Sequence, residues 1–343
     1  MKALRKLSGG SGNVAVVETP VPVPEEDQVL IRVERAGICG TDLHIFHGLF
    51  SKVKPPVTLG HEISGTVEAL GCDVTGWRSG DKVTVESEAY SCGKCQLCES
   101  GFSSLCPDRL ALGYGVDGGF ASFLAVRKTA LHRLPEGATF QEGALCEPLT
   151  VAVHAVLERS NLEKGSWTLV TGPGPIGLLV DQVARHKGAK VIMTGTDKDQ
   201  KRLQVARSLG VDAVINVDRD DLQKEVMELT SGQGVETAFE CSGVGAAIND
   251  CLACVKRRGE IIQVGLSGRF VEMDVDQVAM KEITLKGAFV HNHESWIKAI
   301  ALLAEGAIDL NSLVSGEYPI TEWQEAFRLS EEGSGIKYLL YPV

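Results

Sequence analysis

The feature that most restricts the fold of this chain is a regular alternation of strand and helix patterns after about residue 150. Short buried-strand patterns occur at 167–171, 190–194, 213–216, 235–240 and 260–264. Helical patterns extend to 187 after the first strand and then occur at 198–209, 220–230, 245–257, 295–305 and 321–331. Strands separated by helices of about ten or more residues form right-handed βαβ units. The alternation therefore predicts an α/β domain with a doubly wound parallel sheet.

The loop after the first of these strands has the glycine spacing of a phosphate-binding turn. It reads Gly172-Pro-Gly174-Pro175-Ile176-Gly177 and leads directly into a helix. The first glycine allows a tight turn, the second lets a pyrophosphate approach the backbone, and the third lets helix and strand pack closely. The helix N-terminus then faces the phosphates. Glycines of an ordinary strand–turn–helix connection are the alternative, but the βαβ context favours a dinucleotide cofactor.

An acid about twenty residues after such a loop usually holds the adenosine ribose. Asp197 has this spacing, although the strand-end position itself is Gly195. Arg202 and the lysines near it could instead bind a 2′-phosphate. We expect NAD because Asp197 would repel that phosphate, with NADP as the open alternative. Asp197 could equally be the N-cap of the next helix.

The first 150 residues differ from this pattern. Strand patterns at 14–18, 29–33, 63–70 and 82–86 are separated by turns rich in glycine and proline. Short strands with few long helical patterns predict an irregular, partly barrel-like β domain.

Four of the ten cysteines lie close together, at Cys92, Cys95, Cys98 and Cys106. Four thiolates at these spacings can surround one Zn²⁺ and leave no coordination position open, as in a structural site. Iron–sulfur ligation is a rival, because cluster proteins also use CxxCxxC runs. Four unrelated thiols are the third alternative. We expect structural zinc, because CxxC repeats of this density indicate metal.

A second set of metal ligands is spread along the chain, and consists of Cys39, His61, Glu62 and Glu147. Cys, His and Glu are ligands of Zn²⁺ sites that keep one position open for substrate. We expect Pro148 to keep Glu147 in an extended conformation at the junction of the two regions. Glu62 could bind the metal directly or form a salt bridge beside it, and the two states could alternate.

The residues around Cys39 also suggest a proton path. A dinucleotide and an open zinc site together indicate hydride transfer from an alcohol whose oxygen the metal polarises. The hydroxyl of Thr41 can accept the alcohol proton, and His44 can pass it towards solvent. A packed surface-turn histidine is the alternative for His44. We name Thr41, His44 and Glu147 as the catalytic candidates.

Charge and length limit the partners. The chain has 343 residues, enough for two domains, and a formal net charge of -11. That charge disfavours nucleic acid and anionic membrane surfaces. We find no apolar signal-peptide core and no run long enough to span a membrane, and so expect a cytoplasmic protein.

The motifs together resemble those of the zinc-dependent medium-chain dehydrogenase superfamily, and within it the polyol (sorbitol) and threonine dehydrogenases. The similarity covers essentially the whole chain. It runs through 37–42, 60–62, the four-cysteine lobe, 147–149, the glycine loop and 264–266. The resemblance implies a GroES-like catalytic domain formed by 1–149 and 288–343, with a Rossmann domain at 150–287.

The resemblance also implies one catalytic and one structural zinc per chain, and a homotetramer. Glu147 would replace a thiolate of the ethanol-type enzymes. The backbone of Val264, Gly265 and Leu266 would hold the nicotinamide amide.

Two departures from the family pattern concern the substrate. Ile45 stands where sorbitol dehydrogenases usually carry Tyr, and Val290 where they tend to carry Arg. The threonine enzymes normally have Asp-Pro rather than Glu147-Pro148. We therefore expect a sugar alcohol, vicinal diol or related secondary alcohol as substrate, giving the ketone. An L-threonine 3-dehydrogenase is the alternative enzyme. A binding module built on the four-cysteine lobe is a rival of another class, which the net charge and the glycine loop disfavour.

Overall fold

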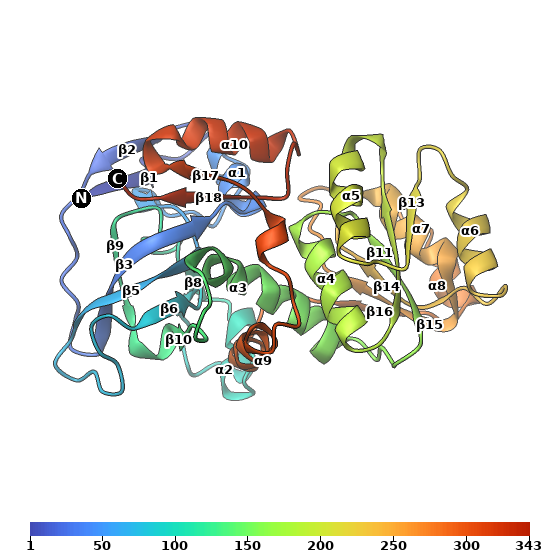
Figure 1. The fold of residues 1–343 in the computed structure, drawn as a ribbon, viewed down its shortest axis with the longest axis horizontal. Helices are drawn as coiled ribbons and strands as arrows, with labels where there is room; N and C mark the ends of the chain where they lie inside the picture. Colours follow the sequence, from blue (N-terminus) through green and yellow to red (C-terminus); the bar gives the residue numbers. More distant parts are fainter. The chain divides into compact units, whose positions relative to one another are not determined.

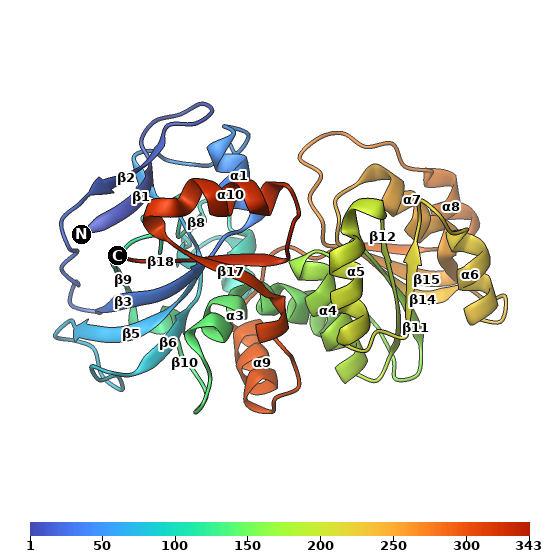
Figure 2. The same cartoon turned by 45° about the horizontal axis from the view of Figure 1, so that its top comes forward.

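The computed structural model describes residues 1–343, which separate into two compact units (Figure 1). The first unit comprises Met1–Glu147, Asn292–Glu305 and Leu310–Val343, and the second comprises Pro148–His291 and Gly306–Asp309. The first unit is thus built from both ends of the chain, and the two termini lie near each other in it in both views (Figures 1 and 2).

A seven-stranded sheet forms the frame of the first unit, in the order β10-β6-β5-β3-β18-β17 with β9 also paired to β3. Its strands are β3 (Gln28–Gly37), β5 (Glu62–Leu70), β6 (Lys82–Val85), β9 (Phe123–Arg127), β10 (Leu131–Arg133), β17 (Val314–Pro319) and β18 (Lys337–Tyr341). β18 pairs antiparallel with β3, so the last strand of the chain completes a sheet begun near its start. In β3 the side chains of Val29, Ile31 and Val33 belong to the core cluster, and their spacing of two places them on one face of the strand.

Smaller elements complete the first unit. They are a three-stranded sheet of β1 (Lys2–Lys6), β2 (Val14–Glu18) and β4 (Val57–Thr58), the pair β7 (Glu88–Tyr90) and β8 (Leu110–Ala111), and the helices α1 (Gly40–Phe46), α2 (Gln96–Glu99), α9 (His293–Ala304) and α10 (Trp323–Glu331). Figures 1 and 2 show α10 lying along β17 and β18. Its Trp323 and Phe327, one helical turn apart, are buried in the core of the sheet.

The second unit is a six-stranded parallel sheet in the order β13-β12-β11-β14-β15-β16. The strands are β11 (Trp167–Thr171), β12 (Lys190–Gly195), β13 (Ala213–Asn216), β14 (Val235–Glu240), β15 (Val255–Gln263) and β16 (Thr284–Gly287), and the helices are α4 (Pro175–His186), α5 (Gln200–Ser208), α6 (Leu222–Leu229), α7 (Gly245–Cys254) and α8 (Val275–Met280). Strand order reverses direction at β11, so α4 and α5 cover one face and α7 and α8 the other (Figures 1 and 2). This is the expected doubly wound sheet, and the expected fold class is confirmed.

The expected boundary between the helix at 245–257 and the strand at 260–264 is wrong. α7 ends at Cys254, whereas a helix to 257 was expected, and β15 starts at Val255 rather than near residue 260. Val255 already pairs with Val235 of β14 across an irregular register. Arg258 has a positive φ of 59°, which no helix allows.

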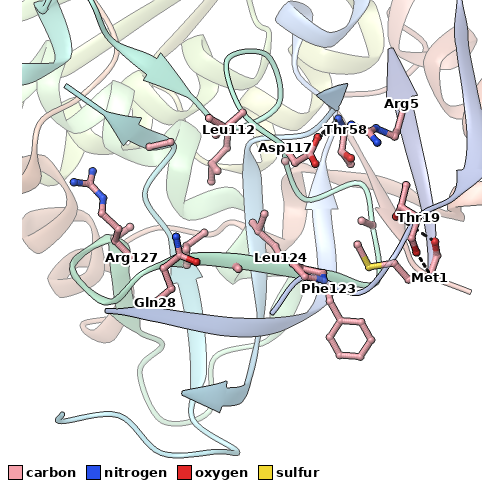
Figure 3. Close-up of a pocket in the computed structure, with 18 of the residues that line it drawn as sticks. Met1, Arg5, Thr19, Gln28, Thr58, Leu112, Asp117, Phe123, Leu124 and Arg127 are labelled. Carbon is pink, nitrogen blue, oxygen red and sulfur yellow. Dashed lines mark hydrogen bonds and ion pairs between the residues drawn. The ribbon is translucent and has the colours of Figure 1, made fainter. Parts of the chain in front are cut away.

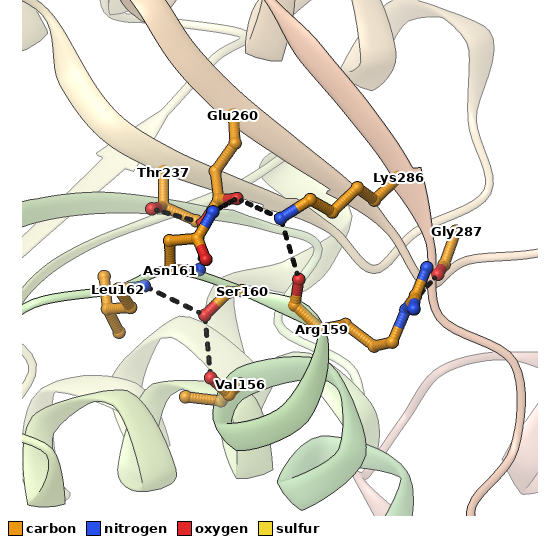
Figure 4. Close-up of polar contacts among 9 residues, drawn as sticks. All are labelled: Val156, Arg159, Ser160, Asn161, Leu162, Thr237, Glu260, Lys286 and Gly287. Carbon is orange, nitrogen blue, oxygen red and sulfur yellow. Dashed lines mark hydrogen bonds and ion pairs between the residues drawn. The ribbon is translucent and has the colours of Figure 1, made fainter.

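A polar network in the second unit secures the segment that follows helix α3 (Phe140–Val153) and the π-helix His154–Arg159 (Figure 4). The buried carboxylate of Glu260 accepts hydrogen bonds from the backbone and amide of Asn161 and pairs with Lys286 at 2.9 Å. Lys286 Nζ also donates to the carbonyl of Arg159, whose guanidinium donates to Gly287. The network joins the π-helix end to β15 and β16.

None of the helices combines the length and the apolar character that crossing a bilayer requires.

Candidate active site

Asp42 organises the segment that carries Cys39. Its side chain is fully buried in the first turn of α1. One carboxylate oxygen accepts the Cys39 backbone N–H at 3.0 Å, and the other accepts that of Gly60 at 3.3 Å. Burial raises the pKa of Asp42, while the nearby His61 opposes that rise. Asp42 therefore links the Cys39 segment to the residue before His61.

Sheet register completes the cluster. Glu62 starts β5 and pairs with Gly37 of β3, so His61 and Glu62 lie beside the end of the strand that leads to Cys39. The ligand atoms of Cys39, His61 and Glu62 all lie within 4.8 Å of one another. His61 and Glu62 are buried. The structure thus brings together three of the four expected ligands of the open metal site.

The cluster has the electrostatics of a cation site. Burial acts to lower the pKa of His61, but the charge of Cys39 and of the acids around it raises that pKa well above its usual value. Nδ1 of His61 and Oε2 of Glu62 are buried without a hydrogen-bond partner. Burying a polar atom without a partner costs free energy, which a bound cation would offset. Zn²⁺ accepts thiolate sulfur, imidazole nitrogen and carboxylate oxygen as ligands. These residues fit a bound zinc ion.

Glu62 also forms a buried ion pair that the sequence did not indicate. Nζ of Lys337, in β18, lies 2.7 Å from Oε1 of Glu62 and 2.9 Å from the carbonyl oxygen of Ile38. Burial lowers the pKa of Lys337, but Glu62 and Cys39 outweigh burial and raise it. Of the two expected states of Glu62, metal ligand or salt bridge, the structure shows the salt bridge.

Glu147 does not have the expected extended backbone. It lies inside α3, and Pro148 follows it within the same helix. Ala144, Leu145, Cys146 and Leu149 around it are all buried, so tertiary packing holds the helix although Pro148 offers no N–H. Ser87 Oγ donates to Glu147 Oε1 at 3.2 Å. The charge of Glu147 contributes to the raised pKa of His61, but its oxygens lie outside the group of three ligand atoms.

The two proton-path candidates lie on α1. Thr41 Oγ1 lies 3.8 Å from Cys39 Sγ, so the structure brings it to the cluster. His44, in the last turn, is exposed and its side chain makes no hydrogen bond or ion pair. Its position at the surface suits the exchange of a proton with solvent.

The four-cysteine lobe converges as expected. The sulfur atoms of Cys92, Cys95, Cys98 and Cys106 lie within 4.8 Å of one another. Cys95 and Cys98 are 3.5 Å apart and Cys92 and Cys98 are 3.9 Å apart. Zn–S bonds of about 2.3 Å place tetrahedral sulfurs roughly 3.8 Å apart. The lobe therefore fits one zinc ion with four thiolates and no open position.

The glycine loop lines a cavity of about 380 Å³ in the second unit, together with Thr196, Asp199 and Arg202. A Cβ at Gly177 would lie 2.0 Å from the carbonyl oxygen of Gly172, so α4 packs against the loop only because residue 177 is glycine. Pro175 and Ile176 form the first turn of α4. The N-terminus of α4 thus opens on the cavity, as phosphate binding requires.

Asp197 is not among the residues that line this cavity. Its carboxylate instead accepts hydrogen bonds from Arg219 at 2.6 Å and Asn216 at 2.7 Å, and these hold the pKa of Asp197 below its usual value. It is not the N-cap of α5 either, because α5 starts at Gln200 after Asp199.

Val264, Gly265 and Leu266 follow β15. The backbone N–H groups of Val264 and Gly265 both donate to the carbonyl of Glu240, at 2.9 and 2.8 Å. Gly265 and the exposed Leu266 line a second cavity of about 560 Å³.

A further cavity, of about 440 Å³, lies in the first unit among Arg5, Thr58, Asp117 and Phe123 (Figure 3). None of the expected site residues lines it. Its main ionic contact joins Arg5 to Asp117 at 3.1 Å.

Comparison with known proteins agrees with this geometry. A model of the alcohol dehydrogenase GroES-like domain matches 25–136, and a model of zinc-binding dehydrogenases matches 175–305. A sorbitol dehydrogenase of Halalkalibacterium halodurans is 41% identical over 100% of both chains. A D-arabitol-phosphate dehydrogenase of Enterococcus avium is 39% identical, over 99% of this chain and 97% of the relative.

Less similar proteins include one named for a different substrate. An L-threonine 3-dehydrogenase of Stenotrophomonas maltophilia is 34% identical over 99% of both chains. A solved zinc-binding dehydrogenase of Sinorhizobium meliloti bound to NADP superposes with a TM-score of 0.92, at 31% identity and 99% coverage of both chains. The chain therefore belongs to the zinc-dependent medium-chain dehydrogenase superfamily, as its motifs led us to expect.

Proposed function

We propose that this chain is a zinc- and NAD(P)-dependent dehydrogenase that oxidises a secondary alcohol of a polyol, sugar phosphate or vicinal diol to the ketone. The observation that supports this most directly is the buried Cys39–His61–Glu62 cluster, with Glu147 next to it and unpartnered donor atoms within it. The relatives that are 41% and 39% identical act on a polyol and on a polyol phosphate by their names.

The residues of the cluster bind the metal in this proposal. Cys39 and His61 hold the metal, with Glu147 or Glu62 as the third protein ligand. When bound, zinc polarises the substrate oxygen and the nicotinamide accepts the hydride.

The remaining residues orient these groups and move the proton. Asp42 fixes the Cys39 segment, and Ser87 orients the Glu147 carboxylate. The hydroxyl of Thr41 takes the alcohol proton, and the exposed His44 transfers it to solvent.

The same proposal covers the cofactor and the assembly. The glycine loop, from Gly172 to Gly177, would bind the pyrophosphate at the N-terminus of α4. Val264, Gly265 and Leu266 would hold the nicotinamide end. We place the catalytic domain at 1–149 and 288–343 and the cofactor domain at 150–287, in a cytoplasmic homotetramer. We propose no nucleic-acid or membrane partner.

An L-threonine 3-dehydrogenase is the second candidate, because a threonine enzyme shares 34% identity over almost the whole chain. The Glu147-Pro148 junction counts against it, since threonine enzymes are expected to carry Asp there. Sorbitol as the particular substrate is weakened by Ile45, whose side chain is buried in the core and offers no hydroxyl.

A substrate panel tests the proposal. The zinc-loaded enzyme is assayed with polyols, their phosphates, 2,3-butanediol and L-threonine, each with NAD⁺ and with NADP⁺. A kcat/KM at least about ten times higher on a polyol, polyol phosphate or diol than on threonine supports the first candidate, and the reverse ratio supports the second. Metal analysis should give at least two zinc ions per chain. One zinc per chain with full activity would contradict the catalytic site.

A further inference from the structure

Three residues outside the proposed active site converge on one another in the first unit. They are Glu86, directly after β6, His132 in β10 and His293, the first residue of α9. Nε2 of His132 and Nδ1 of His293 each lie 2.6 Å from the same oxygen, Oε1 of Glu86. All three donor atoms lie within 4.8 Å of one another. None of the three belongs to the four-cysteine lobe or to the cluster around Cys39.

The surroundings hold two of these side chains in place. The ring of His132 stacks on the buried Trp296 of α9, with centroids 5.1 Å apart and planes at 5°. The backbone N–H of Glu86 donates to the carbonyl of Ala130, just before β10. Side chains of Glu86 and His132 are 13% and 11% exposed, whereas that of His293 is 64% exposed. The cluster is therefore anchored on one side and open to solvent on the other.

We propose that Glu86, His132 and His293 form a third metal site, which binds a divalent transition-metal ion such as Zn²⁺. Two imidazoles and one carboxylate are a ligand set that zinc uses when water completes the coordination. Bond lengths of about 2.0 Å place such donors roughly 3.3 Å apart. The two nitrogen–oxygen distances of 2.6 Å are shorter than this, and all three donor atoms lie within 4.8 Å of one another. Imidazole ligands favour Zn²⁺, Co²⁺ or Ni²⁺ over Mg²⁺ and Ca²⁺, which prefer oxygen.

A cation at this position would connect the first turn of α9 to the sheet edge formed by β6 and β10. It would also brace the segment that follows β6, which lies next to the proposed active site. Ser87, the residue after Glu86, donates a hydrogen bond to Glu147. The site thus offers a way for free metal to affect the rigidity of that segment. It does not depend on the identity of the substrate.

The test is a Zn²⁺ titration by calorimetry on the enzyme whose two family sites are already loaded. Wild type is compared with His293→Ala, which removes a mostly exposed side chain, and with Glu86→Gln. The matched control is His47→Ala, because His47 also pairs with a carboxylate, that of Glu331, but belongs to no cluster of three metal-binding side chains. We expect wild type and His47→Ala to bind one further zinc ion, and the two cluster variants to bind it at least about ten-fold more weakly.

Cobalt gives a second readout that needs no activity. Co²⁺ added to the zinc-loaded wild type should give a weak visible absorption without thiolate charge transfer, and the band should be absent in His293→Ala. Mg²⁺ should not compete with it. A wild type that takes up no third ion, or a His293→Ala variant that binds Zn²⁺ as tightly as wild type, would overturn the proposal.

Discussion

Nζ of Lys337 lies 2.7 Å from Oε1 of Glu62, and the two side chains are only 4% and 1% exposed. Lys337 starts the last strand of the chain and Glu62 starts β5, so the pair joins segments 275 positions apart. A buried charge without its partner is strongly destabilising. The C-terminal strand therefore carries the counter-charge for an acid of the proposed metal site.

Replacing Lys337 by Met should reduce the free energy of unfolding by about 3–5 kcal/mol, because Glu62 then stays buried and uncompensated. Urea denaturation of the zinc-loaded enzyme measures this loss. The control is Lys298→Met, which breaks a pair with Glu294 whose side chains are 33% and 70% exposed, and which should cost less than about 1 kcal/mol. Adding Glu62→Gln to Lys337→Met should restore part of the stability. Equal losses for Lys337→Met and the control would show that another group compensates Glu62.

Ser87→Ala should lower kcat about ten-fold and leave the KM for the cofactor unchanged. The variant removes the hydroxyl that donates to Glu147, and loss of such an outer hydrogen bond typically costs 10–100-fold in metal affinity or activity. Thr84→Val is the matched control, because it removes a buried hydroxyl that donates only to a backbone carbonyl, that of Ile63. Steady-state kinetics with varied cofactor at saturating substrate give both values for the two variants. An unchanged kcat in Ser87→Ala would remove Ser87 from the positioning of Glu147.

The parts of the molecule that the sequence predicted are those in which local pattern and packing agree. The strands at 167–171, 213–216 and 235–240 have the predicted bounds, because each is a short apolar run between polar turns. The glycine loop was recognisable because its third position requires glycine. A Cβ at Gly177 would lie 2.0 Å from the carbonyl oxygen of Gly172. The spacing of its four cysteines also indicated the four-cysteine lobe.

The sequence could not predict relationships that depend on distant packing. Local preference predicted an extended Glu147 before proline, but burial on both sides keeps it helical. Nothing near Lys337 or Ser87 indicates its partner, since Lys337 contacts the start of a different strand and Ser87 contacts a residue of helix α3. Asp42 alone had a local signal, as an acid three residues after the helix N-cap Cys39.

The geometry of the cofactor cavity predicts which charged residue discriminates between NAD⁺ and NADP⁺. Arg202 lines the cavity, whereas Asp197 is engaged by Arg219 and Asn216 outside its lining. Arg202→Ala should therefore lower kcat/KM with NADP⁺ at least about ten-fold more than with NAD⁺, as expected for a lost charged hydrogen bond to phosphate. Asp197→Ala should leave the ratio of the two values nearly unchanged. A large gain in NADP⁺ use by Asp197→Ala would show that Asp197 repels the 2′-phosphate after all.

The thiols of the four-cysteine lobe should differ in reactivity once the metal is removed. Hydrogen bonds from the backbone, that of Lys94 first, lower the pKa of Cys92 to about 7, whereas burial raises the pKa of Cys98 to about 12. Only the thiolate is nucleophilic. In chelator-treated protein, alkylation of Cys92 by iodoacetamide should therefore rise as the pH increases through about 7 and then level off, while Cys98 stays slow. Peptide mapping after brief labelling measures both rates in one sample, and zinc should protect both residues. Equal labelling of Cys92 and Cys98 at neutral pH would contradict this ordering.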